Sequence, residues 1–147
     1  MIVLDTSVFV DAIIPFDVKR HDLALNLIDL ISRRGLEVYE PQLLEVELSA
    51  VLVRYKPRRI VENHVNRVLA HVAVIAYDEL HKTALQVALA TGCRAVDAFF
   101  IACATETSSI LVSNDRAQVQ SARRAGVRAF YLLEEHQKLR AELQKLW

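Results

Sequence analysis

Glycine, proline and cysteine are all scarce in this sequence of 147 residues, which contains three glycines, three prolines and two cysteines. A phosphate-binding P-loop or a dinucleotide-binding turn needs two or three glycines within about eight residues, whereas Gly35, Gly92 and Gly126 lie far apart. Two cysteines are too few for a disulfide framework. The composition therefore excludes P-loop enzymes, the usual dinucleotide-binding enzymes and small disulfide-stabilised folds.

An excess of one charge and a long apolar run are also missing. Eighteen lysine and arginine residues balance eighteen acidic residues, so the net charge argues neither for nor against a nucleic-acid partner. No apolar run approaches the roughly 20 residues that span a bilayer, and the N-terminus lacks the features of a signal peptide. We therefore expect a soluble, cytoplasmic protein with no membrane partner. The length is typical of one domain, which predicts a single domain over residues 1–147.

Two further kinds of catalytic site are not indicated by the spacing of residues. The five histidines show neither the HxH nor the HExxH spacing that is typical of zinc sites. Ser7 and Ser113 lie outside any GxSxG motif, so a serine nucleophile is not expected. Cys103 falls within an apolar segment, where a thiol usually belongs to the core.

Short apolar segments alternate with segments of helical periodicity along the whole chain. We expect strands at residues 2–4, 36–39, 72–77, 110–112 and 127–132. We expect helices at residues 20–34, 41–54, 58–70, 78–91, 96–107, 116–125 and in the tail, 133–147. Strands that alternate with helices predict an α/β fold whose parallel sheet is covered on both faces.

Two aspartates directly follow predicted strands. Asp5 comes after the first strand and Asp115 after the strand at residues 110–112, and each has a serine two residues away, Ser7 or Ser113. Ligands of open α/β sheets bind outside the carboxyl ends of the strands, so these positions are candidates for a site. The alternative is that each aspartate simply caps the helix that follows it.

Two more carboxylates lie on predicted apolar helices. On a helical wheel of residues 43–54, Glu47 falls among leucine and valine side chains, whereas Glu45 falls on the polar edge. A buried carboxylate costs several kcal/mol unless it is paired or bound to a cation. Asp97 stands at the start of the helix at residues 96–107, where it could also be an N-cap. A salt bridge to an arginine would be the alternative for Glu47.

The four carboxylates together suggest one acidic site, since no lysine lies near them in the sequence to neutralise them. Hard oxygen ligands of this kind suit Mg²⁺ or Mn²⁺. Metals held in this way polarise a phosphodiester and lower the pKa of an attacking water. The pattern therefore favours phosphoryl chemistry.

Four segments of the chain resemble, in their order and spacing, the PIN domain, and more narrowly the VapC-type toxins of prokaryotic toxin–antitoxin pairs and their archaeal relatives. The segments are DTSVFVDA at 5–12, PQLLEVELSAVLVR at 41–54, RAVDAFFIACATE at 94–106 and LVSNDR at 111–116. The resemblance implies a three-layer fold with a central parallel sheet of about five strands between helices. It also implies homodimers, and an antitoxin protein whose tail enters the acidic groove.

The same resemblance assigns roles to individual residues. It implies that Asp5, Glu47, Asp97 and Asp115 form a catalytic quartet that binds Mg²⁺ or Mn²⁺ for RNA hydrolysis. It also implies that the two serines, Ser7 and Ser113, supply supporting hydroxyls that orient the carboxylates or a bound water. No organic cofactor is implied.

The match to the family pattern leaves three points open. Glu45 competes with Glu47 as the second acid, although the helical wheel favours Glu47. Asp11 is an additional acid, which we interpret as a solvated or capping residue. Some relatives carry a further acid just after the last aspartate, where this chain has Ala117 and Gln118, so the number of metal ions stays open.

We therefore predict a metal-dependent endoribonuclease that cleaves single-stranded RNA and acts as the toxin of a toxin–antitoxin pair. The alternatives are a PIN ribonuclease of RNA processing or decay, and a catalytically inactive PIN-like module that binds protein or RNA. A receiver-like signalling domain is not favoured, because the chain lacks that domain's paired initial acids and late lysine. The many apolar residues of the helix at 41–54 predict a homodimer.

Overall fold

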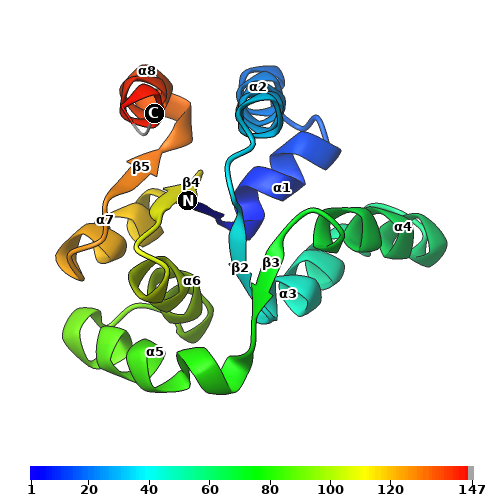
Figure 1. Ribbon diagram of the computed structural model, residues 1–147. Coiled ribbons are helices and arrows are strands. Elements are labelled where there is room, and N and C mark those ends of the chain that lie inside the picture. Colours follow the sequence, from blue (N-terminus) through cyan, green and yellow to red (C-terminus); the bar gives the residue numbers. More distant parts are fainter. Residues whose placement is uncertain (146–147) are drawn as a thin grey trace.

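The computed structural model describes residues 1–145, which form eight helices and five short strands (Figure 1). In chain order they are β1 (Ile2–Leu4), α1 (Thr6–Ile13), α2 (Val18–Arg34), β2 (Tyr39–Pro41), α3 (Leu43–Leu52), α4 (Arg58–Leu69), β3 (Ala73–Ile75), α5 (Tyr77–Thr91), α6 (Ala95–Glu106), β4 (Ile110–Ser113), α7 (Arg116–Arg124), β5 (Ala129–Tyr131) and α8 (Leu132–Gln144). The predicted alternation of strands and helices is confirmed.

The strands are all parallel. β4 lies between β1 and β5 in a sheet of three strands, and β2 pairs with β3. A single parallel bridge between Ile2 and Val38 connects the two groups. The order across the fold is therefore β3–β2–β1–β4–β5, which is the expected parallel sheet of about five strands, divided into a group of three and a pair.

The division between β1 and β2 has a local cause in a buried side chain. Ile2 donates its backbone N–H to the carbonyl of Glu37 at 3.0 Å, as in a regular parallel ladder. The next donor of β1, the N–H of Leu4, instead bonds to Oε1 of Glu40 at 2.8 Å. The Glu40 side chain, which is fully buried, takes the place of a backbone carbonyl and ends the ladder after one bridge.

Helices cover both faces of these strands, as the sequence predicts. α6 packs against β1, β2 and β4, and α5 packs on the outside of α6. α1 packs against β1 and β4, and α2 packs against both α1 and α8 (Figure 1). The result is a layer of strands between two layers of helices.

The centre of the core is α6, which is apolar on nearly every side. Phe100, Ile101, Ala102 and Cys103 have no exposed surface. The expected core position of the Cys103 thiol is confirmed. Within residues 1–145, no helix taken alone has the length and apolar character of a membrane span, and the bent pair that would qualify jointly, α5 with α6, includes this core helix.

Caps and glycines explain where several helices begin and end. Asp17 accepts the N–H of Arg20 at 2.9 Å and starts α2. Gly35, with a φ of 60°, and Gly92, with a φ of 68°, end α2 and α5 in the left-handed conformation that glycine adopts without strain.

Several expectations are wrong: α1 was not expected, and the strand expected at residues 72–77 is limited to β3. The strand expected at residues 36–39 is β2, which begins only at Tyr39 and runs to Pro41, and the N–H of Gln42 still donates to the carbonyl of Ile75, the last residue of β3. Pro41 therefore ends a strand, and α3 begins only at Leu43. The last strand is shorter than expected, since α8 already begins at Leu132. Of the predicted helical tail, residues 146–147 lie outside the described part of the chain.

Candidate active site

The carboxyl ends of β1 and β4 meet at one edge of the sheet and bring two predicted site residues together. Leu4 lies opposite Val112 in the parallel pairing, so Asp5 and Ser113 follow side by side. The hydroxyl of Ser113 donates to Oδ2 of Asp5 at 3.1 Å, and the backbone N–H of Ser7 donates to the same oxygen at 3.1 Å. Asp5 is buried, and these two bonds fix the plane of its carboxylate.

The two predicted serines form a second layer behind Asp5. The Ser7 hydroxyl accepts the N–H of Asn114 at 2.9 Å, and the Ser113 hydroxyl accepts the N–H of Asp115 at 2.8 Å. Each serine therefore ties the chain after β1 to the chain after β4. Their position fits a role in orienting carboxylates.

Glu47 reaches the same place from α3. Its Oε2 accepts a hydrogen bond of 2.5 Å from the hydroxyl of Thr6, the residue next to Asp5. Burial raises the pKa of Glu47, the negative charges of Asp5 and Asp97 raise it further, and the Thr6 bond and Arg94 oppose them. Sequence reasoning missed Thr6, although it stands between two residues that were singled out.

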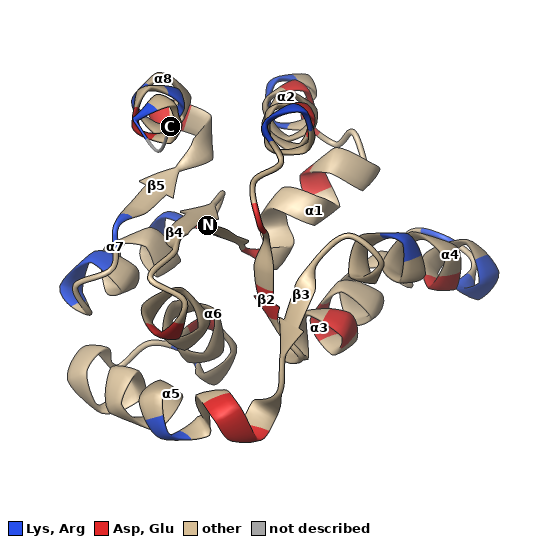
Figure 2. Cartoon of the chain, viewed as in Figure 1, with Lys and Arg blue, Asp and Glu red and all other residues tan. Residues whose placement is uncertain are grey.

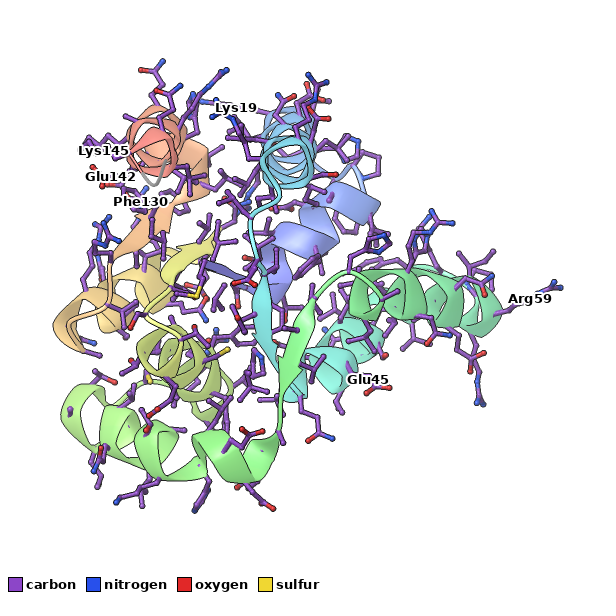
Figure 3. The ribbon with its side chains drawn as sticks, in the orientation of Figure 1. Lys19, Glu45, Arg59, Phe130, Glu142 and Lys145 are labelled. Carbon is purple, nitrogen blue, oxygen red and sulfur yellow. The ribbon has the colours of Figure 1, made fainter. Side chains whose placement is uncertain are left out.

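Glu45, the competing acid on the same helix, is exposed and points away from the rest of the chain (Figure 3). The helical wheel therefore predicted correctly that Glu45 is the exposed glutamate and Glu47 the more buried one. Glu47 faces the other carboxylates, and Glu45 faces solvent.

Asp97 is not an N-cap, and that alternative is wrong. Arg94 is the N-cap residue of α6, because its carbonyl accepts the N–H of Ala98 at 3.0 Å. Asp97 is the third residue of the helix, and only 6% of its surface is exposed. Burial raises its pKa, and the charges of Asp5 and Asp115 add to the effect.

Asp115 serves both as a cap and as a member of the cluster. Its Oδ1 accepts the backbone N–H groups of Ala117 at 2.9 Å and Gln118 at 3.3 Å, which starts α7. Its Oδ2 accepts a hydrogen bond of 2.9 Å from Nη2 of Arg94. The capping role is confirmed, and the second carboxylate oxygen stays free of the cap and bonds to Arg94, so the site role stays a prediction.

Arg94 is the cation that the sequence reasoning overlooked. Its guanidinium donates from Nε to Oδ2 of Asp97 at 3.0 Å and from Nη2 to Oδ1 of Asp97 at 3.3 Å, besides the bond to Asp115. These acids raise the pKa of Arg94, as does Glu47. The sequence analysis noted the absence of a nearby lysine and considered an arginine partner for Glu47 alone, whereas Arg94 pairs with Asp97 and Asp115.

Asp11 is neither a cap nor a solvated residue, contrary to the interpretation from sequence. Its Oδ2 accepts a hydrogen bond of 2.6 Å from the amide of Asn114 and lies 3.5 Å from Nε of Arg20. Asn114 also accepts the backbone N–H of Leu133 at 3.2 Å through Oδ1. Asp11 therefore helps to hold the residue between Ser113 and Asp115, behind the carboxylate cluster.

The four predicted carboxylates lie close to the strands. Figure 2 shows acidic positions on the central strands and on α3 and α6, besides others on the outer helices, and basic positions on α4 and α7. Burial is the main cause of the raised pKa values of Glu47 and Asp97, and the negative charge of Asp5 adds to both. Four negative charges in one place require a compensating cation.

The carboxylates fit a divalent metal ion by their chemistry, since all four supply hard oxygen ligands. Their arrangement differs from that of a formed metal site. Within residues 1–145, no three aspartate, glutamate, histidine or cysteine side chains converge closely enough to hold an ion. Instead, the Arg94 guanidinium lies between Asp97 and Asp115, where a shared cation would be bound.

Comparisons with known proteins agree with this architecture. The family model described as the PIN domain matches residues 2–124. FitAcB from Neisseria gonorrhoeae has a similar structure, with a TM-score of 0.69 at 18% identity over 88% of this chain and 96% of that chain. VapBC2 from Rickettsia felis, bound to a DNA fragment from its promoter, gives 0.62 at 19% identity over 88% and 98% of the chains.

A third similar structure is PAE2754 from Pyrobaculum aerophilum, with a TM-score of 0.61 at 20% identity over 87% of this chain and 89% of that chain. The comparison with curated proteins gave no significant match. At these identities the structural likeness shows a common fold.

Proposed function

Because the chain belongs to the PIN domain family, we propose that it is a metal-dependent endoribonuclease that hydrolyses phosphodiester bonds of single-stranded RNA. PIN domains are generally nucleases. The observation that supports the proposal is the approach of four carboxylates near the carboxyl ends of β1 and β4: Asp5 and Asp115 directly after these strands, Glu47 from α3 and Asp97 from α6. Carboxylates that repel one another and are partly buried destabilise the folded state unless a cation binds to them.

In this proposal the four carboxylates hold Mg²⁺ or Mn²⁺. When bound, such an ion lowers the pKa of an attacking water and stabilises charge on the phosphodiester. The protein's own groups orient the ligands, because Ser113 holds Asp5 and Thr6 holds Glu47 through hydrogen bonds. We further propose that residues 1–147 act as one nuclease domain.

The experiment compares single-stranded RNA and DNA oligonucleotides after dialysis of the protein against EDTA. We expect RNA cleavage only after Mg²⁺ or Mn²⁺ is added. The variants Glu47→Gln and Glu45→Gln form a matched pair on α3, since one faces the cluster and the other faces solvent. Glu47→Gln should lower the rate by at least about a hundredfold, the scale of one misplaced electrostatic group, and Glu45→Gln should leave it unchanged.

Cleavage that survives both EDTA and Asp5→Ala would refute the proposed reaction. Absence of cleavage with tight RNA binding would support the inactive binding module instead. Cleavage of DNA in preference to RNA would refute the proposed substrate.

We also propose that the protein is the toxin of a toxin–antitoxin pair and has a protein antitoxin as partner. The support is the likeness of fold to FitAcB and VapBC2 over most of each chain. Expression of the protein in a bacterial host should stop growth, and co-expression of a small protein encoded just upstream should restore it. Normal growth at a confirmed level of active protein would favour a nuclease of RNA processing or decay.

A further inference from the structure

The Arg94 guanidinium occupies most of the ligand atoms that two of the proposed metal-binding carboxylates offer. It bonds to both oxygens of Asp97 and to Oδ2 of Asp115. The fourth oxygen, Oδ1 of Asp115, accepts the N–H groups that cap α7. All four carboxylate oxygens of this pair are therefore already engaged within the chain.

A divalent ion and a guanidinium compete for these oxygens, because both are cations that bind carboxylate lone pairs and they repel each other at close range. Metal binding to Asp97 and Asp115 is therefore opposed by Arg94 as long as the guanidinium stays between them. The fold allows the displacement, since 73% of the Arg94 side chain is exposed. The cap that Arg94 supplies to α6 uses its backbone carbonyl and no side-chain hydrogen bond, so the helix does not depend on the guanidinium.

We propose that Arg94 is an internal counter-ion of the acidic site, which occupies the cation position between Asp97 and Asp115 and is displaced when a divalent metal binds. The proposal rests on the proposed metal-dependent function. It adds that Arg94 lowers the affinity of the site for metal, because a metal ion that displaces Arg94 has to replace the arginine–carboxylate bonds.

The test measures Mn²⁺ affinity by calorimetry for the wild type and for Arg94→Gln. Two partly exposed ion pairs are worth about 0.2–1 kcal/mol each, which corresponds to about a two- to thirtyfold lower Kd in the variant. Arg94→Lys keeps the charge but loses the planar fork, so its Kd should fall between the two. Thermal unfolding in EDTA and in Mg²⁺ should show a larger Mg²⁺-induced rise in Tm for Arg94→Gln than for the wild type.

Arg116→Gln is the matched control. Arg116 follows Asp115 directly and is also largely exposed, but it pairs with Glu134 at 2.5 Å and not with the cluster. The substitution Arg116→Gln removes one positive charge from the same region without freeing a carboxylate of the site. Its Kd for Mn²⁺ should stay within about twofold of the wild-type value, as expected for a screened surface charge.

The outcomes separate this proposal from the proposed function. If neither the wild type nor Arg94→Gln binds Mn²⁺, the metal site is wrong and the counter-ion proposal fails with it. If both bind with the same Kd, or if Arg94→Gln binds more weakly, the metal site stands and the counter-ion proposal is overturned. An equal gain in affinity for Arg116→Gln would also overturn it, because the effect would then come from the general charge.

A spectroscopic measurement tests the displacement directly and does not depend on a charge-removing variant. The Nε–H signal of Arg94, assigned by its loss in Arg94→Lys, should move toward the position of a solvent-exposed arginine when Mg²⁺ is added to the wild type. An unchanged signal at saturating Mg²⁺ would overturn the proposal.

Discussion

At the scale of single residues, the cluster is built from side chains that serve structure and site together. Asp5 and Asp115 both cap the helix that follows them and both face the other carboxylates. The sequence could present these roles only as alternatives, because a cap and a ligand share one residue type and one position after a strand. In the structure Oδ1 of Asp115 accepts the capping bonds, and Oδ2 bonds to Arg94 within the cluster.

Asp115 allows the two roles to be separated by substitution. Asp115→Asn retains an oxygen for the cap, so we expect a Tm close to that of the wild type. Asp115→Ala removes the cap, which costs about 1 kcal/mol, or about 2–4 °C in Tm for a chain of this length. Both variants should lose RNA cleavage. Equal Tm values for the two variants in a thermal melt would show that the cap contributes nothing.

The pH dependence of thermal stability in Asp97→Asn tests the repulsion within the cluster. Burial and the neighbouring acids raise its folded-state pKa above the ordinary value of 3.8. The unfolded chain then releases the proton first, so wild-type stability falls as the pH rises from near 3.8 through the folded pKa. Asp97→Asn lacks this loss, so in EDTA its Tm should exceed that of the wild type near neutral pH and approach it in acid.

The control for Asp97→Asn is Asp22→Asn, at an exposed position of α2. It should leave the Tm nearly unchanged at every pH. Mg²⁺ should stabilise the wild type by mass action and stabilise Asp97→Asn much less. A variant that melts with the wild type in EDTA and responds equally to Mg²⁺ would exclude Asp97 from the site.

At the scale of elements, the sequence predicted the limits of a helix or strand well where those limits depend on its own residues. The prediction failed where they depend on residues far away in the sequence. The helix expected at residues 96–107 and the strand expected at 110–112 are α6 and β4, displaced by one residue or less. Their limits depend on their own apolar residues. β2 was misplaced because its extent depends on pairing with β3 and on the bond between Glu40 and Leu4, which no local pattern contains.

The same reasoning applies to the site. Asp5, Glu47, Asp97 and Asp115 were all found as acids in unfavourable or strand-end positions, and the structure brings them together, although their role as metal ligands stays a prediction. Arg94 was missed because its three-residue distance from Asp97 is also typical of an ordinary exposed pair on a helix. Only the approach of Asp115, 21 residues later, distinguishes it.

Glu40 links β1 to β2 and provides a prediction at this scale. Burial raises its pKa well above the ordinary value of 4.5, and the charge of Asp5 adds to the effect. Wild-type stability should therefore fall as the pH rises above about 4.5 toward the folded pKa. Glu40→Gln keeps an acceptor for the Leu4 N–H and cannot ionise, so its Tm should match the wild type in acid and exceed it at pH 8.

Glu40→Leu is the informative contrast. It leaves the buried N–H of Leu4 without its acceptor, which costs about 1–3 kcal/mol. Chemical denaturation of the three proteins at pH 5 and pH 8 checks the order. A Glu40→Gln variant that is less stable than the wild type at pH 8 would show that the ionised carboxylate is favourable there.

At the scale of the whole molecule, the surface carries apolar side chains that suit association with a second copy of the chain. Leu85 and Leu89 lie four residues apart on one face of α5, and Val46 and Val53 lie seven apart at α3. All four are exposed, Leu89 to 80%. Apolar positions at these spacings form stripes along a helix, which are favourable when buried in an interface.

We therefore predict a homodimer in which α5 takes part. Light scattering should give twice the chain mass of 16.6 kDa at micromolar concentration. Leu89→Glu should give a folded monomer, since a charge in an apolar interface opposes association. Val18→Glu, at a position on α2 that is 72% exposed, is the matched control and should remain dimeric. A wild-type protein of monomer mass would contradict the prediction.

The hydrogen bond between Ser113 and Asp5 joins residues 108 positions apart, and this separation determines when the carboxylate cluster can form during synthesis. At about 5–20 residues per second, Asp5 is synthesised about 5–20 s before its partner. Throughout that interval Asp5 lacks the hydroxyl of Ser113 that donates to its carboxylate. The cluster around Asp5 and Asp115 therefore assembles late in synthesis, only after the chain through β4 has left the ribosome.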